Sequence, residues 1–150
     1  MEQFDIIGVL KAYALAQIPA WKFTYGFDNF YQSAQTVGQF TPGQLVLIAD
    51  FQAVPTFKNG RIPLITYTCL LMLGRKFDAN GQVVSLDETT DQKYDRRLKD
   101  LMQFLSTAIA DVSCQNGLEV SVGSMVVEIN QFAENLDFAS AQNVQFIQGQ

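Results

Sequence analysis

The feature that most constrains the fold is a one-sided helical pattern between Thr90 and Cys114. Apolar residues recur there at intervals of three and four and form a single stripe: Leu98, Leu101, Met102, Leu105, Ala108, Ile109 and Val112. Such a stripe predicts a helix that packs one face against another element and exposes the other face to water. Thr89 followed by Gln92 fits a capping box at its start, and the QNG at 115–117 ends it.

Alternating patterns before this helix predict the sheet on which it packs. Residues 45–51 and 64–74 are apolar and β-prone, and the segment between them reads QAVPTFKNGRIP. Its Asn-Gly dipeptide favours a tight hairpin turn, and its two prolines cannot donate hydrogen bonds to a sheet. We therefore interpret residues 44–74 as one long antiparallel hairpin whose tip projects from the sheet.

The N-terminal part predicts one more helix and one more strand. Residues 3–17 show helical spacing of apolar residues, and Pro19 prevents the helix from continuing. The aromatic-rich segment from Trp21 to Tyr31 alternates in a way that favours a strand.

After the second helix, the alternation changes phase. Leu118, Val120 and Val122 alternate, and then Met125, Val127 and Ile129 alternate on the opposite parity. The change falls at Gly123 and predicts a β-bulge or bend there. With a last strand in the C-terminal segment, the prediction is a single domain over residues 1–150. Its fold class is α+β, with two helices packed on an antiparallel sheet that carries the projecting hairpin.

Charge is distributed unevenly along the chain. Residues 1–100 carry ten acidic and ten basic residues, whereas residues 101–150 carry five acidic and no basic ones, so this last third supplies the whole net charge of −5. An acidic surface disfavours binding to a nucleic-acid backbone. The pattern fits a subunit with two unlike faces, and it fits equally a chance excess on a solvated surface.

Residue types that carry chemistry are sparse. The chain has no histidine and no phosphate-binding or nucleophile-elbow motif, and the spacing of Asp28, Asp50 and Asp78 indicates no metal site. We therefore expect no catalytic, cofactor or metal site and a protein that is not an enzyme. Cys69 and Cys114 form no CxxC pair, and we interpret both as buried free thiols in a reducing compartment. No apolar run is long enough to cross a bilayer, so we expect no membrane partner.

One family resemblance emerges from the element order and the C-terminus. A hairpin, a long helix that opens with Asp, Lys and Arg, and the ending NQFAENLDFASAQNVQFIQ together resemble the tail-terminator and tail-completion proteins of tailed bacteriophages. In many of these proteins an Asn-x-Asp-apolar segment leads into the last strand. The matching residues here are Asn135, Asp137, Phe138, Val144 and Phe146.

The resemblance implies a structural virion protein that forms a homo-oligomeric ring at the head–tail neck or the tail end. It would be assembled in the host cytoplasm with other neck or tail proteins, and DNA would pass without specific binding. The candidate interface residues are Phe57, Lys58, Asn59, Gly60, Arg61, Lys93, Arg96 and Arg97. The candidate lumen or acidic-face residues are Asp111, Glu119, Glu128, Glu134 and Asp137.

The alternative hypothesis is a small α+β domain that binds a ligand or a protein. In that case the aromatic residues between Trp21 and Tyr31 would line the pocket. Oligomeric state separates the two hypotheses, because a binding domain should remain monomeric or dimeric.

Overall fold

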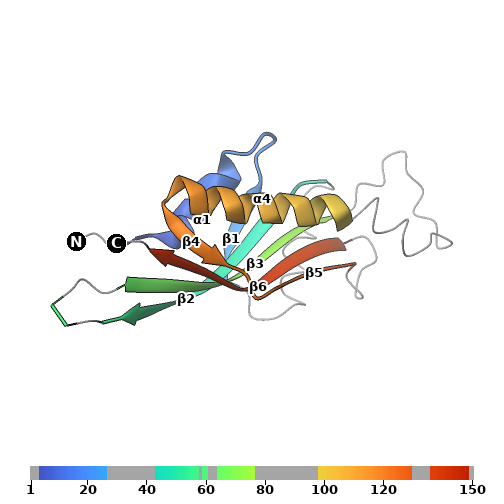
Figure 1. Cartoon of the computed structure of the whole chain (residues 1–150). Helices are drawn as coiled ribbons and strands as arrows, with labels where there is room; N and C mark the ends of the chain where they lie inside the picture. Colours follow the sequence, from blue (N-terminus) through green and yellow to red (C-terminus); the bar gives the residue numbers. More distant parts are fainter. Residues whose placement is uncertain are drawn as a thin grey trace, which may run out of the picture.

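The computed structural model describes residues 4–26, 43–57, 59–60, 64–76, 98–129 and 136–148 (Figure 1). These residues form two helices and a six-stranded sheet, so the predicted α+β class is confirmed. The elements in chain order are α1 (Ile6–Leu15), β1 (Lys22–Tyr25), β2 (Val46–Thr56), β3 (Leu64–Lys76), α4 (Lys99–Gln115), β4 (Leu118–Ser121), β5 (Ser124–Ile129) and β6 (Leu136–Gln148).

The strand order is β1-β2-β3-β6-β4, and β5 also pairs with β6. All pairs are antiparallel except β1 with β2, which run parallel from Lys22↔Val46 to Tyr25↔Ala49. This pair corrects the expectation of a purely antiparallel sheet. Both helices lie on the same face of the sheet (Figure 1).

Strands β2 and β3 pair without interruption from Val46↔Gly74 to Thr56↔Leu64. The connection between them lies partly outside the described residues, so the projection of its tip stays a prediction. The last five residues of β2 are exposed on both faces of the strand, in contrast to the buried first four. The free end of this strand pair is therefore a surface and not part of the core.

The core lies between the helices and the sheet. The predicted stripe of α4 is confirmed, because Leu101, Leu105 and Val112 have no exposed surface. From α1, Ile6 and Leu10 join the same cluster. Helix α4 is described only from Lys99, so the predicted capping box at Thr89 falls outside the described residues, and α4 ends one residue beyond the predicted Cys114.

Helix α1 is shorter than the predicted span of 3–17. Asp5 caps its start, with its carboxylate accepting a hydrogen bond from the backbone N–H of Gly8 at 2.9 Å. An aspartate at this position satisfies a donor that the helix leaves without an internal partner. The helix ends at Leu15, and Pro19 stands a few residues beyond, as expected.

The predicted change of phase in the apolar alternation at Gly123 is confirmed, because the chain bends there between β4 and β5. Beside this bend, the alternation of core-facing side chains along β6 also changes phase. On β6, Ala139 and Ala141 face the core, and then Val144 and Phe146 face it on the opposite parity. The register of β6 against β3 shifts at this point, between Cys69 and Leu71. One extra residue in β6 turns its apolar side chains back toward the helices, which is what a bulge does.

Two residues make possible the bend between β4 and β5 and the neighbouring bulge in β6. Asn143 adopts a φ of +52°, a left-handed conformation that asparagine tolerates better than most residues. Gly123 lies against it, and its N–H donates to the carbonyls of Gln142 at 3.1 Å and Asn143 at 3.2 Å. A Cβ on Gly123 would lie 2.8 Å from the Cβ of Asn143, so only glycine fits.

Candidate assembly surfaces

Among the described residues, one concave surface lies where the loop after α1 meets the start of β2 and the outer side of α4. It has a volume of about 340 Å³, and we name it the Trp21 pocket. Its lining residues are Gln17, Ile18, Pro19, Trp21, Gly43, Gln44, Leu45 and Phe104. Trp21 is buried, whereas Ile18 is 98% exposed and Phe104 is 40% exposed. The pocket therefore has a fixed aromatic residue in its wall and an unusually exposed apolar rim.

Hydrogen bonds hold the wall of the Trp21 pocket in place. The N–H of Trp21 donates to the carbonyl of Ala14 at 3.0 Å, which ties the loop to the end of α1. The side chain of Gln44 donates to the carbonyl of Ala20 at 2.7 Å, which ties the loop to the start of β2. The indole ring also meets Tyr13 edge-on at 5.9 Å between ring centres and Phe104 at 6.5 Å. The pocket is thus preformed in the isolated chain.

A second apolar surface lies at the other end of β2. Phe57, immediately after the strand, is 74% exposed, and Val54 within it is 46% exposed. Single exposed apolar side chains are ordinary on protein surfaces, but Phe57 is large and lies at the exposed end of a strand pair, where Val54 projects from the opposite side of the strand. We call this surface the Phe57 end. Of the other predicted tip residues, Asn59 and Gly60 are exposed, and Gly60 has the positive φ of 72° that suits a tight turn.

Pairing of β1 with the outer edge of β2 stops at Ala49, and beyond it no other described strand pairs with this edge. The carbonyls of Leu45 and Ala49 accept hydrogen bonds from the N–H groups of Lys22 in β1 and of Gly26 directly after it, so odd-numbered residues of β2 direct their backbone groups to this edge. Farther along, Phe51 already donates its N–H to the Asp50 carboxylate at 2.8 Å, and Pro55 has none. Among the residues of β2 past the pairing with β1, only Ala53 therefore offers a backbone donor to this edge, and this part of the strand is poorly suited to pairing with another strand.

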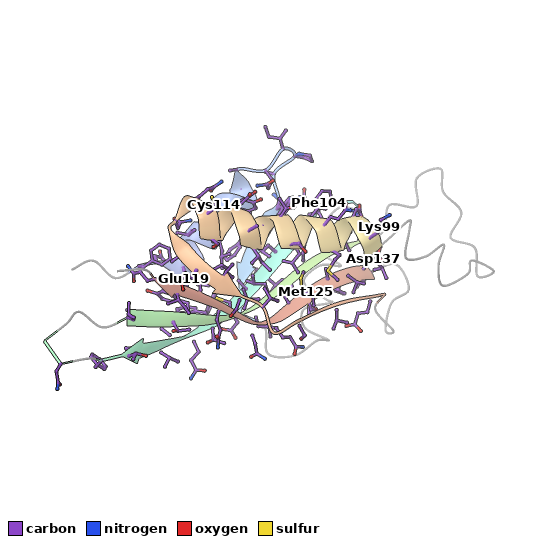
Figure 2. All side chains as sticks on the ribbon, viewed as in Figure 1. Lys99, Phe104, Cys114, Glu119, Met125 and Asp137 are labelled. Carbon is purple, nitrogen blue, oxygen red and sulfur yellow. The ribbon has the colours of Figure 1, made fainter. Side chains whose placement is uncertain are left out.

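The five acidic candidates do not form one surface. Asp111 lies on α4 and accepts a hydrogen bond from the hydroxyl of Tyr13 at 2.7 Å. Glu119 is exposed on β4 (Figure 2), and Glu128 is exposed on β5. Leu118, Val120 and Val127, which adjoin these glutamates in the strands, pack against the core, so the two glutamates project from the side of β4 and β5 that faces away from α1 and α4. Burial, followed by the bond to Asp111, raises the pKa of Tyr13 to about 12.

Asp137 is fully buried, and this corrects its assignment to an acidic surface. In the register of the sheet it lies directly opposite Arg75, close to the start of α4 (Figure 2). Arg75 forms a two-pronged ion pair with Asp100 in the first turn of α4, with both N–O distances at 2.8 Å. The sequence analysis did not predict this ion pair, because Arg75 and Asp100 are separated by 25 positions in the chain.

The remaining candidates fall on residues whose placement the structure does not describe. They are Lys58, Arg61, Lys93, Arg96, Arg97 and Glu134. Their roles stay predictions.

Two lining residues of the Trp21 pocket that the sequence analysis did not single out are nevertheless unusual in the sequence. Phe104 is an aromatic residue off the apolar stripe of α4, and Ile18 is an apolar residue in a loop before proline.

A second concavity of about 430 Å³ lies on the sheet beside the bulge in β6. It is lined by Asp50, Phe51, Gln52, Thr68, Cys69, Leu70, Gln142 and Asn143. Its lining combines polar and apolar side chains, and Asp50 is the only charged residue among the described ones that line it. In the described part of the chain, no three side chains of the types that bind metals gather in one place.

The binding-domain hypothesis expects the aromatic residues between Trp21 and Tyr31 to line one pocket, but those that the structure describes lie in different environments. Trp21 lines the pocket, whereas Tyr25 is exposed and packs edge-on against Phe51 at 6.3 Å between ring centres. Phe27, Phe30 and Tyr31 lie outside the described residues. Of the described residues in this aromatic segment, only Trp21 contributes to the pocket.

The two cysteines differ, which corrects the expectation that both are buried. Cys69 is buried in the sheet, and Cys114 is exposed near the end of α4 (Figure 2). Burial, followed by the nearby Asp50 carboxylate, raises the pKa of the Cys69 thiol to about 12. At pH 8 the reactive thiolate of Cys69 is then on the order of one part in ten thousand.

We therefore expect the native protein at pH 8 to react with one equivalent of a thiol reagent such as dithionitrobenzoate. Cys114→Ser should remove that reaction, and Cys69→Ser should leave it unchanged. After denaturation the wild type should react with two equivalents. Rapid reaction of two equivalents in the native state would contradict the burial of Cys69.

Comparison with known proteins identifies no family, because no protein-family model and no curated protein matches this chain. None of the described helices is both long and apolar enough to span a bilayer.

Proposed function

We propose that this protein is a structural virion component that assembles with copies of itself into a ring. The ring would sit at the head–tail neck or at the tail end of a tailed bacteriophage, where it joins or caps the tail tube. Its place in the particle rests on the resemblance of the element order and the C-terminal segment to tail-terminator and tail-completion proteins.

The observation that supports the proposed self-assembly is the presence of two different apolar surfaces on one chain. The Trp21 pocket is concave and lies beside the helices, whereas Phe57 is an exposed aromatic side chain directly after β2, at the other end of that strand. A ring with cyclic symmetry needs two unlike patches that fit each other, because each subunit contacts a different surface of the next. A two-fold dimer instead needs one patch that fits itself.

The side of β4 and β5 that faces away from α1 and α4 is a candidate for the ring lumen. Glu119 and Glu128 are exposed on it, and among the described residues that project from this face of β4 and β5 there is no Lys or Arg. A surface of this charge lets DNA pass without sticking, since phosphate binding relies on basic side chains.

Solution mass tests the proposal. The 16.8 kDa chain should form particles of one discrete mass, at more than twice the monomer mass, in mass photometry at low salt. Particles that remain monomers or dimers at every protein concentration would contradict the proposal and favour the ligand-binding alternative. The ring proposal also predicts that assembly does not require an added small molecule.

A further inference from the structure

We infer that Asn59, in the connection between β2 and β3, is a site of spontaneous deamidation in the folded protein, whereas Asn116 is protected from the same reaction by the fold. Each of these asparagines is followed directly by a glycine. A third such pair, at Asn80, lies outside the described residues. The reaction takes place within a single chain and does not depend on the proposed ring.

Deamidation at an Asn-Gly pair needs only the chain itself and water. The backbone nitrogen of the glycine attacks the side-chain Cγ of the asparagine and forms a new C–N bond. The Cγ–Nδ2 bond breaks, and the nitrogen leaves as ammonia together with the proton of the glycine N–H. Water then adds to either carbonyl of the cyclic succinimide and opens it to aspartate or isoaspartate. Glycine favours the first step because it has no side chain that obstructs the attack and its backbone rotates freely.

The surroundings of Asn59 leave this reaction free to proceed. Asn59 and Gly60 are both exposed and lie in a turn beyond the end of β2. Gly60 has a φ of 72°, and nothing lies within 4 Å of the place that a Cβ would occupy on it. No described residue forms a hydrogen bond with the side chain of Asn59. The side-chain amide and the nitrogen of Gly60 can therefore rotate toward each other, and water reaches both.

Asn116 has the same neighbour in the sequence but a fixed conformation. Its side-chain nitrogen donates a hydrogen bond to the carbonyl of Val112 in α4 at 2.9 Å. It directly follows the last residue of α4, with a φ of −115° and a ψ of 8°. At this ψ the nitrogen of Gly117 nearly eclipses the nitrogen of Asn116 itself and points away from the Asn116 side chain. Ring closure therefore requires the hydrogen bond to break and the end of the helix to rearrange.

Access to water does not distinguish the two sites. Gly117 is exposed, like Gly60, and nothing lies within 4 Å of its Cβ position either. The difference between the sites is the conformation in which each asparagine is held. Local structure of this kind opens only through a fluctuation of the helix end, which makes the protected state the dominant one.

The product would change the charge of the segment KNGR at 58–61. By sequence this segment has a net charge of +2 from Lys58 and Arg61, and a carboxylate at position 59 would lower it to +1. Isoaspartate would also insert an extra methylene into the main chain of the turn. These four residues are candidates for the subunit interface, so the modification would alter that surface as the protein ages.

Peptide mapping of the aged native protein tests the inference. The wild type is kept folded in warm, mildly alkaline buffer and sampled over time. Chymotryptic digestion puts Asn59, Asn80 and Asn116 on separate peptides, and mass spectrometry follows the replacement of NH₂ by OH on each. Asn59 should deamidate at least about tenfold faster than Asn116, because breaking the hydrogen bond of Asn116 raises the barrier enough for a factor of this size.

Two controls separate conformation from sequence. In urea the unfolded chain should deamidate at Asn59 and Asn116 at similar rates, because both are then flexible Asn-Gly pairs. Asn59→Gln should stop the reaction at this position, since the longer side chain must close a larger ring. Because the site is exposed, this variant should melt within a few degrees of the wild type.

Two results would overturn the inference. One is that Asn59 and Asn116 deamidate in the native protein at rates within about tenfold of each other. The other is that Asn59 stays intact in the native protein over the time in which the unfolded chain reacts. Neither result bears on the proposed ring, which the solution mass tests separately.

Discussion

Leu105→Asp should unfold the protein. Leu105 has no exposed surface and packs between α4 and the sheet, where the described structure offers it no basic partner. Burying an unpaired carboxylate costs several kcal/mol, and a domain of this size is stable by only about 5–15 kcal/mol. Soluble yield should fall sharply, and the remaining protein should lack a cooperative melting transition.

Thr107→Asp provides the matched control for this substitution. Thr107 lies two residues farther along α4 on its exposed side, and Thr and Asp have similar helix propensities. We expect the control to melt within a few degrees of the wild type. A native-like melting curve for Leu105→Asp would contradict the placement of the α4 stripe in the core.

Gly123→Ala should destabilise the fold by about 1–3 kcal/mol, the usual cost of forcing extra atoms into a packed site. The new Cβ would lie 2.8 Å from the Cβ of Asn143 and 3.1 Å from the carbonyl oxygen of Gln142, so one strand must move. The shift would disturb the bend that turns Val144 and Phe146 into the core. Chemical denaturation of the variant and the wild type measures the difference.

A second substitution separates the steric cost from a general effect of alanine. Asn143→Gly removes the nearer clashing atom and retains a residue that tolerates positive φ. In that background Gly123→Ala should cost clearly less, which is the signature of direct coupling between two sites. Ser124→Ala, at the adjacent exposed position, should change stability by less than about 0.5 kcal/mol. Equal costs of Gly123→Ala in both backgrounds would contradict the close approach.

The sequence was most informative where periodicity and burial coincide. The α4 stripe, the pairing strands β2 and β3 and the change of phase at Gly123 were all predictable, because each depends on residues within one short segment. The parallel pairing of β1 with β2 was not, since it depends on where the chain returns after residue 26. Short strands such as β1 carry too few residues to indicate their direction.

The candidate surfaces were less predictable than the fold. Phe57 was identified from its place in the hairpin, whereas the Trp21 pocket brings together residues from three separate parts of the chain. For Asp137 the prediction from the sequence was wrong. Charge suggested a surface residue, but it occupies a buried position across from Arg75, and charge alone does not report burial. An ion pair such as Arg75 with Asp100 needs the three-dimensional register before it can be found.

The central claim is that copies of this chain join in a closed ring through unlike surfaces. A density map of the assembled wild-type particle tests it most directly. The proposal predicts cyclic symmetry higher than two-fold, an open central channel, and a contact between two unlike surfaces at every subunit boundary. A map that shows two-fold dimers with identical surfaces in contact, or no particle larger than a dimer, would contradict it.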